Sequence, residues 1–400
     1  MNINNFFKNK VGQYAMLTAN VLKNNVRQYA MLIALVFVTV LFQILTTGTL
    51  LKPQNVANLI LQNGYVIILA IGMTLCILTG GNIDLSVGSV VAFIGAMVGI
   101  FITKWNVNIF LAIGMALLVG VAVGVWQGFF IAYVRIPAFI TTLAGMLLFR
   151  GLTNTILQGQ TISPFPKEFS DISAGYIPDI VKGSKFNILT IIVGILIAVI
   201  YLLLQFRKRA NTKKYKFEVL SMPLFIGKLI VVLAAIGLMT YWLADFKGIP
   251  IALVIIGALV VIYSFITNKT VPGRQIYAMG GNEKAARLSG IKTKKVMFLV
   301  YTNMAVLTAV AGVMWTSRLN AASPVAGNNF ELDAIAACFV GGASATGGVG
   351  TITGALIGAF FIGVLNNGMS ILGVGSDWQM TIKGLVLLGS VAFDVLSKKK

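Results

Sequence analysis

Three acidic residues stand at the starts of apolar segments, where their carboxylates could border a polar passage through a membrane. Asp84 lies in TGGNIDLSVGS between two apolar runs, and Glu331 and Asp333 lie in GNNFELDAIAAC. A carboxylate and irregular backbone at membrane depth are tolerated only where protein or water covers them. The chemistry that this pattern indicates is passage of a polar solute or, as an alternative, binding of a cation or proton.

Helix breaks would position these carboxylates. Gly80 and Gly81 can end one helix, and Asn82, Asp84 or Ser86 after them can cap the next. The element NIDL is echoed by NFEL at 329–332, which predicts two related halves with broken helices at corresponding places, a common sign of a transport path. Capping and lining a passage are compatible roles. The candidate path residues are Asn82, Asp84, Ser86, Asn329, Glu331 and Asp333.

Charged partners for the acidic residues are few. Within the long apolar runs, Arg150 and Lys383 are the candidate cations. An ion-coupled carrier normally adds more polar or ionisable groups at membrane depth, so ion coupling is the weaker interpretation.

The composition predicts an all-α integral membrane protein. Hydrophobic residues make up 58% of the chain and charged residues 10%, against about 25% charged in soluble domains. Eleven apolar runs are long enough for about 30 Å of hydrocarbon, and the piece 331–342 is shorter and is predicted to be re-entrant or broken. The twelve predicted membrane segments are 29–49, 57–80, 85–103, 108–133, 137–158, 187–206, 224–246, 249–268, 296–317, 331–342, 350–372 and 378–396.

The distribution of basic residues predicts the topology. Placing the N-terminus in the cytoplasm leaves only seven of the 31 Lys and Arg residues in outside loops, as the positive-inside rule requires. Both termini are therefore predicted to be cytoplasmic. The predicted parts are a cytoplasmic segment 1–28, a single transmembrane domain 29–396 and a cytoplasmic tail 397–400. Within the domain lie an extracytoplasmic loop 160–186, a basic loop with two spans at 207–268, and a cytoplasmic loop 270–295.

Several classes of function are disfavoured. The chain has no histidine, so a Ser-His-Asp or Cys-His site cannot form, and it has no G-x-x-x-x-G-K-[ST] loop for nucleotide phosphates. Cys76 and Cys338 lie in apolar runs and suit buried packing. No cofactor or metal site is predicted. The net charge of +20 is dispersed over loops, which favours contact with membrane lipids over nucleic-acid binding.

Small residues at four-residue spacing predict close helix packing. Two rows of glycines show it, GVAVGVWQG with Gly120, Gly124 and Gly128, and GTITGALIG with Gly350, Gly354 and Gly358. Trp126 and Trp315 lie within predicted spans, where packing is the simpler interpretation and stacking on a sugar ring the alternative.

The cytoplasmic stretch GRQIYAMGGNEKAARLSGIKTKK, residues 273–295, predicts a short surface helix. Asn282 can cap a helix over 283–289, and Gly290 can end it. Because two helical turns alone are unstable, the helix is expected to dock on a partner protein. Ala285, Ala286 and Leu288 are expected to pack into that partner, and Lys284 to face solvent.

Five pieces of the chain resemble the membrane permeases of bacterial sugar ABC importers, in the xylose and multiple-monosaccharide branch of the ribose-type family. They are GNIDLSVGS (81–89), IPAFITTLAGMLLFRG (136–151), GRQIYAMGGNEKAARLSGI (273–291), SPVAGNNFELDAIAACFVGG (323–342) and WQMTIKG (378–384). The resemblance implies import of a monosaccharide by a homodimer that works with an ATP-binding subunit and an extracytoplasmic sugar-binding protein. It also implies a coupling helix formed by Gly280, Gly281, Asn282, Glu283, Ala285, Ala286, Arg287, Leu288, Ser289 and Gly290.

Alternatives remain open at this point. The piece 207–268 departs from the shorter ribose-type pattern, and its role is not assigned. The branched-chain amino acid permeases of the same superfamily are the nearest alternative. An ion-coupled sugar carrier and a purely structural membrane scaffold are more distant ones.

Overall fold

The computed structural model describes residues 26–181, 183–215 and 219–398. The predicted N-terminal segment 1–28 falls almost wholly outside this part. The described residues form helices joined by short loops, and their bounds are α2 (Val26–Leu45), α3 (Pro53–Leu78), α4 (Val87–Thr103), α5 (Ile109–Phe129), η1 (Phe130–Val134), α6 (Ala138–Leu157), α7 (Lys167–Ala174), α8 (Ile188–Lys214), α9 (Met222–Asp245), α10 (Ile251–Lys269), α11 (Val271–Gly281), α12 (Glu283–Leu288), α13 (Thr293–Leu319), α14 (Phe330–Val340), α15 (Ile352–Ile371) and α16 (Ser376–Lys398).

The predicted all-helical membrane architecture is confirmed for this part of the chain. Nine of its helices are long and apolar enough to cross a membrane, and the apolar parts of α2 and α4 are shorter. Helix α14 has 11 residues, about 16 Å at 1.5 Å per residue, roughly half of a bilayer core. Every predicted membrane segment thus contains a helix, and the number of twelve membrane segments stays a prediction.

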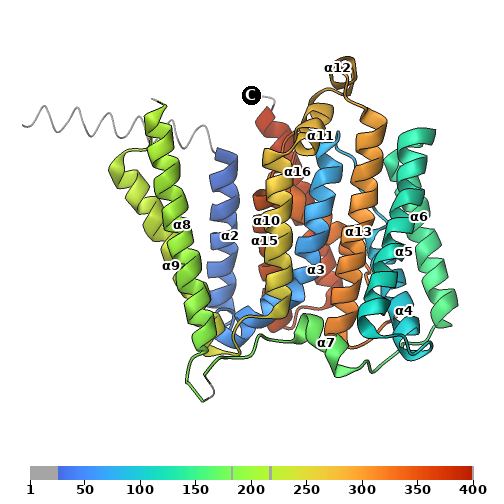
Figure 1. The fold of residues 1–400 in the computed structure, drawn as a ribbon, viewed down its shortest axis with the longest axis horizontal. Coiled ribbons are helices and arrows are strands. Elements are labelled where there is room, and N and C mark those ends of the chain that lie inside the picture. Colours follow the sequence, from blue (N-terminus) through green and yellow to red (C-terminus); the bar gives the residue numbers. More distant parts are fainter. Residues whose placement is uncertain (1–25, 182, 216–218, 399–400) are drawn as a thin grey trace, which may run out of the picture.

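The long helices run between two ends of the bundle (Figure 1). We call the end that carries α12 the α12 face and the opposite end, which carries α7, the α7 face. Helix α2 begins and α16 ends at the α12 face. The basic end of α8 and the loop before α13 lie at that face as well.

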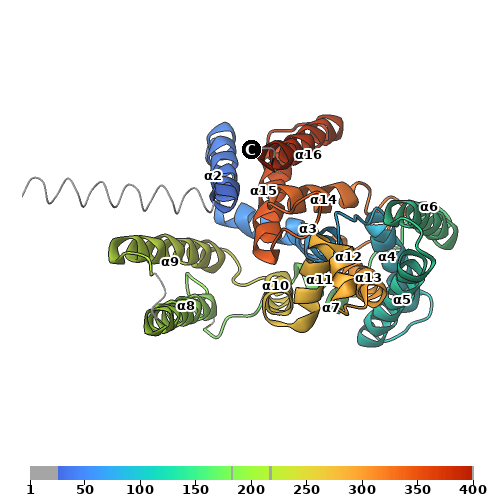
Figure 2. The ribbon, with the colours of Figure 1, turned by 90° about the horizontal axis from the view of Figure 1, so that it is seen from above.

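Helix α3 is the centre of the fold. In its most apolar window 83% of the residues are buried, and it packs against α13, α15, α14 and α10 (Figure 2). Gly64 and Gly72 allow the close approach, because a side chain at Gly72 would collide with Met304 of α13 and one at Gly64 would press on Ile256 of α10.

Helices α8 and α9 form a hairpin beside the bundle (Figures 1 and 2). Only 11% of the apolar window of each helix is buried. The following α10 packs on α3 instead. The stretch 207–268, predicted as one insertion, therefore divides into the basic end of α8, the outlying α9 and the core helix α10.

The glycine rows behave differently in the two halves. Side chains added at Gly120 and Gly124 of α5 would collide with α13, and one at Gly128 would press on it, which confirms the predicted packing face. Gly358 of α15 meets the backbone of Ala337 in α14 in the same way, and Gly354 meets that of Gly341 directly after α14. The prediction for Gly350 is wrong: it lies before α15 begins and has φ of +151°, so it serves the loop and not the helix face.

Candidate functional site

Asp84 fills the break between α3 and α4. Gly80 and Gly81 end α3 with positive φ values of 123° and 77°. The Asp84 carboxylate is buried, and its Oδ1 accepts the backbone N–H of Ser86 at 2.9 Å and the Ser86 hydroxyl at 2.6 Å. Ser86, predicted as a possible cap, donates to Asp84 and makes no side-chain cap itself. Asp84 therefore holds the break together from inside the protein.

The second acidic helix start is built differently. Asn329 takes the left-handed conformation and makes no capping bond. Asp333 lies inside the first turn of α14, where its Oδ1 pairs with Lys383 Nζ of α16 at 2.9 Å and its Oδ2 accepts the Tyr65 hydroxyl at 3.1 Å. This ion pair confirms the prediction that Lys383 is a charged partner of one of the acidic residues. The side chain of Asp333 is 4% exposed, so this carboxylate is neutralised and does not line an open passage.

The two helix starts meet each other. Gly88 in the first turn of α4 packs so closely on Gly327 and Glu331 that a side chain there would collide with both. Arg150 of α6 supports the same loop, since its Nη1 donates to the carbonyls of Pro324 at 2.8 Å and Ala326 at 2.6 Å. Residues from distant parts of the sequence therefore form one junction in the middle of the fold.

Helices α11 and α12 form an elbow on the α12 face (Figure 1). The Asn282 side chain accepts the N–H of Ala285 at 3.0 Å, and Gly290 follows the helix with φ of +87°, as predicted. The preceding α11 was not predicted. Thr270 at its N-cap and Pro272 at its start are the sequence signals that could have revealed it.

The two faces of α12 have different neighbours. Ala286 is buried within its own chain and is 5% exposed, whereas Leu288 is 89% exposed. The expectation that Ala286 packs into a partner is therefore wrong, because Ala286 lies on the face of α12 that packs on the bundle. Leu288 and Lys284 remain available at the surface.

The elbow touches the end of α3 and the loop 341–351, which joins α14 to α15, directly. A side chain at Gly280 would collide with the Leu78 carbonyl, where α3 ends, and with Gly348. Gly348 N–H donates to that carbonyl at 3.1 Å, and the Tyr277 hydroxyl donates to the Gly350 carbonyl at 2.7 Å. We call these three pieces, the elbow, the end of α3 and the loop 341–351, the contact unit.

A cavity of about 880 Å³ opens beside the contact unit. Its wall includes the break residues Thr79, Gly80 and Asn82 together with most of α12. Basic residues from three elements also line it, and these are Arg135, Lys284, Arg287 and Lys294. Of the six predicted path residues, only Asn82 lies on this wall. Asn82 and the predicted coupling residues thus share one cavity.

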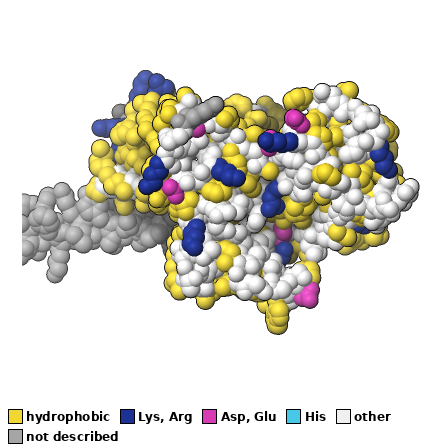
Figure 3. All heavy atoms as spheres, turned by 90° about the horizontal axis from the view of Figure 1, so that it is seen from below, with side chains coloured by type: hydrophobic (Ala, Val, Ile, Leu, Met, Phe, Trp, Pro, Cys, Tyr) yellow, Lys and Arg dark blue, Asp and Glu magenta, His cyan; other side chains and the backbone are white. Residues whose placement is uncertain are grey.

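The described residues of the loop 160–186 lie on the α7 face and are tied to the bundle. Phe169 of α7 is fully buried, and its carbonyl accepts the Ser317 hydroxyl at 2.7 Å. Asp179 accepts the N–H groups of Leu189 and Ile188 at the start of α8, and the Leu189 N–H above all holds the pKa of this exposed carboxyl below its usual range. Exposed basic and acidic side chains are scattered over this face (Figure 3).

Comparison with known proteins assigns the family. The family model described as "Branched-chain amino acid transport system / permease component" matches residues 55–391. The chain belongs to this permease family. It is 38% identical to the xylose transport system permease protein of Haemophilus influenzae over 371 residues, which is 92% of this chain and 96% of that protein.

Ribose permeases are also similar. The ribose import permease protein of Escherichia coli K12 is 36% identical over 85% of both chains, and that of Bacillus subtilis is 34% identical over 90% of both. No solved structure gives a significant match. The resemblance to ABC permeases of the xylose and ribose type is confirmed, and the chain is a multi-pass protein of the bacterial inner membrane.

Proposed function

We propose that this protein is the membrane subunit of an ATP-driven importer that carries a monosaccharide into the cell. The observation that carries the proposal is the α11–α12 elbow, which exposes Leu288 to a partner and contacts the end of α3 and the loop 341–351 on its inner side. The similarity to xylose and ribose permeases supports a sugar as the substrate.

The α12 face is the cytoplasmic side in this proposal. The basic end of α8 and the lysines and arginines around α12 lie at that face, in keeping with the positive-inside rule. Both chain termini are then cytoplasmic, and the α7 face receives the sugar-binding protein. Two copies of the permease are proposed to form the path together.

In this proposal, transport results from a change of the contact unit between two packing arrangements. An ATPase seated on Leu288 would displace α12, and α11 would carry that displacement to the end of α3 and to the loop 341–351 through Gly280 and Tyr277. The contact at Gly280 is made between backbones with little room to yield, so a shift at α12 reaches the end of α3 and the loop 341–351. ATP binding drives the change only through contacts that differ between the two packings.

Two alternatives make different predictions. An amino acid importer would use the same elbow, and the description of the matching family model names branched-chain amino acid transport. An ion-coupled carrier would need carboxylates that can bind an ion, whereas Asp84 is held by Ser86 and Asp333 by Lys383 and Tyr65. Two of the three predicted carboxylates are thus engaged within the protein, which supports ATP-driven transport and leaves Glu331 as the residue that an ion-coupled carrier would have to use.

The test is the ATPase activity of the reconstituted complex. Permease and ATPase are assembled in nanodiscs, and a binding protein loaded with D-xylose is added. We expect ATP hydrolysis to rise with the xylose-loaded protein and to rise less with the empty one. Stimulation by a leucine-loaded protein and not by a sugar-loaded one would replace the sugar assignment with the amino acid alternative.

A further inference from the structure

A groove lies between α10 and α13 and is separate from the cavity beside the contact unit. Both helices pack on α3 and little on each other, so a space remains between them, with Leu75 of α3 in its lining. Figure 2 shows α10 and α13 along one edge of the bundle, with α11 between them at the α12 face. The groove measures about 490 Å³, within the roughly 300 to 1,000 Å³ of ligand pockets.

One end of the groove is basic and its walls are apolar. Lys292 and Lys295 line it at the start of α13, which lies at the α12 face. At the deeper end, the Tyr263 hydroxyl of α10 donates to the Asn303 side chain of α13. Between residues 292 and 303 the helix rises about 16 Å at 1.5 Å per residue, roughly half of the hydrocarbon thickness. Apolar side chains from four helices also line the groove, and these include Leu75, Ile266, Ile276, Val296, Leu299 and Val300.

The charges of the lining select an anion. Lys292 and Lys295 are its charged side chains, and no carboxylate belongs to it. Both lysines are exposed, and neither forms an ion pair within the part of the chain that the structure describes. A headgroup with an ammonium would find no counter-charge here, whereas a phosphate would find two cations. A ligand with an anionic head and a long apolar chain therefore matches the whole groove.

The position of the groove selects a lipid among such ligands. In the proposed orientation its basic end lies at the cytoplasmic surface of the membrane, where lysines attract anionic headgroups, and its apolar length spans one leaflet. The wall residue Leu299 is 51% exposed, so the groove opens sideways, toward the hydrocarbon. A soluble ATPase seated on Leu288 would reach only the basic end.

We infer that this groove binds one anionic phospholipid of the cytoplasmic leaflet, with its phosphate on Lys292 and Lys295 and an acyl chain between α10 and α13. The inference goes beyond the proposed function and does not depend on which solute is carried. Pro272 at the start of α11 and Gly290 after α12 also belong to the lining. The bound lipid therefore touches both ends of the elbow.

The test is photocrosslinking of the complex of permease and ATPase in nanodiscs. The discs contain phosphatidylcholine and a small share of phosphatidylglycerol with a photoreactive group on its acyl chain, and the labelled peptides are identified by mass spectrometry. We expect adducts on the groove segments of α10 and α13. Unlabelled phosphatidylglycerol should displace the probe, and phosphatidylethanolamine should not.

A pair of lysine substitutions tests the headgroup contact. Lys292→Gln with Lys295→Gln should raise the amount of phosphatidylglycerol needed for half-maximal labelling roughly 25-fold, because each lysine contributes about fivefold near an anionic headgroup. The control is Lys284→Gln with Lys294→Gln. It removes the same charge at the same face, but both residues line the cavity beside the contact unit, so labelling of the groove should stay at the wild-type level.

A bulky substitution tests the chain contact. Leu299→Trp should fill the groove and abolish the adducts on α10, while Leu118→Trp, at an exposed leucine of α5, should leave them unchanged. Should Leu299→Trp fail to assemble with the ATPase, the lysine pair carries the test.

The outcomes leave the proposed function aside, because no readout uses sugar uptake. Equal labelling of both lysine pairs, or equal displacement of the probe by phosphatidylethanolamine, would show only general contact with the bilayer and overturns the site. Absence of adducts on the groove in the assembled complex would show that a second copy of the permease or the ATPase covers it, and overturns the site as well.

Discussion

The exposed leucine of α12 offers the most direct mechanical test. Leu288 is 89% exposed in the free permease, so replacing it should change the stability of the permease by no more than about 0.5 kcal/mol. Seated in an ATPase cleft, the same side chain would lose that exposure. Leu288→Ala would remove about three buried carbons, each contributing about 0.8 kcal/mol.

The expected loss is therefore about 1 to 2.4 kcal/mol, which corresponds to a roughly 5- to 50-fold weaker complex at 1.4 kcal/mol per tenfold. Permease in nanodiscs is titrated with labelled ATPase, and the dissociation constant is compared among variants. Lys284→Ala on the same helix and Leu118→Ala, an exposed leucine of α5, serve as controls. An unchanged dissociation constant for Leu288→Ala, with the permease folded, would show that α12 does not dock there.

Ala286→Glu is a poorer probe of the same contact. Ala286 is buried within the permease, so a carboxylate there would have to be desolvated inside the chain, at a cost of several kcal/mol if it stayed charged and unpaired. Loss of the ATPase in this variant would report a damaged elbow and not a lost interface.

Three further predictions concern the core. Lys383→Ala leaves the buried Asp333 without its ion-pair partner and should destabilise the permease by about 3 to 5 kcal/mol. The double variant Lys383→Met with Asp333→Asn should recover most of the lost stability in thermal unfolding. Equal melting temperatures for the single and double variants would contradict the pairing. Gly124→Ala should lower the stability of the permease by about 1 to 3 kcal/mol because its new methyl meets α13. Gly114→Ala, with open space around it, should raise the stability by roughly 0.5 to 1 kcal/mol. The same sign for both changes would refute the packing of the α5 glycine row on α13. Asp84→Asn should keep an acceptor for Ser86 and most of the uptake, and Asp84→Leu should lose both; normal uptake with Leu would exclude the structural role of the carboxylate.

Local features of the fold were predictable from the sequence. The glycine pair before Asp84, the Asn282 cap and the Gly290 end each depend on a few neighbouring residues, and all three appear in the structure. The predicted partnership of an acidic helix start with Lys383 also holds, because few cations exist at membrane depth.

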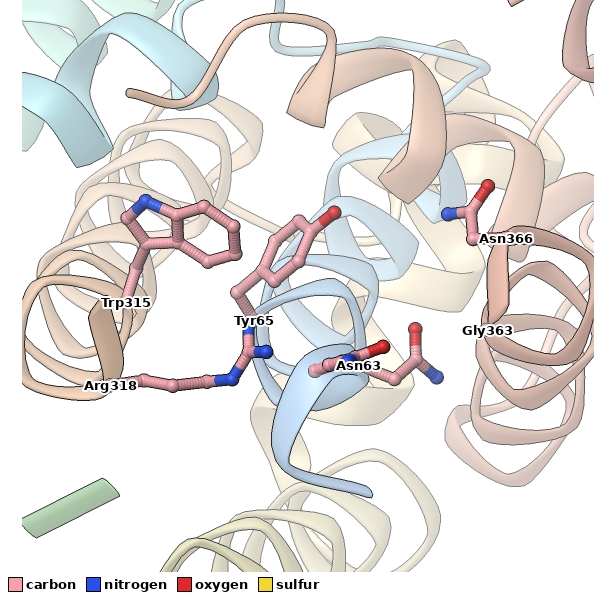
Figure 4. A pocket seen from close by; sticks show the side chains of 7 residues that line it. Asn63, Tyr65, Trp315, Arg318, Gly363 and Asn366 are labelled. Atoms are coloured by element: carbon pink, nitrogen blue, oxygen red, sulfur yellow. The ribbon is translucent and has the colours of Figure 1, made fainter. Parts of the chain in front are cut away.

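Features that depend on three-dimensional packing were not predictable. The face of α12 that carries Ala286 turns inward only because the elbow packs on the bundle. A small cavity brings together Tyr65, Trp315 and Asn366, which lie on three helices far apart in sequence (Figure 4). Similarly, the sequence analysis placed α7 in an extracytoplasmic loop, but Phe169 of this helix is buried in the core, so deleting the helix would damage the fold.

The docking role of the α7 face remains a prediction and needs a milder change. Glu168 is exposed on the first turn of α7, so Glu168→Lys reverses a surface charge without touching Phe169. Stimulation of ATP hydrolysis by the binding protein should weaken, while basal hydrolysis stays constant. Unaltered stimulation across a range of salt concentrations would place the binding-protein contact elsewhere.

The central claim is that ATP hydrolysis by a partner on the α12 face drives sugar through this chain. The measurement that tests it most directly is accumulation of radiolabelled D-xylose in proteoliposomes of permease and ATPase, with binding protein outside and with or without ATP inside. We predict accumulation above the outside concentration only with ATP, and its loss in the Leu288→Ala complex at limiting ATPase. Accumulation driven by a proton or sodium gradient without ATP would contradict the claim.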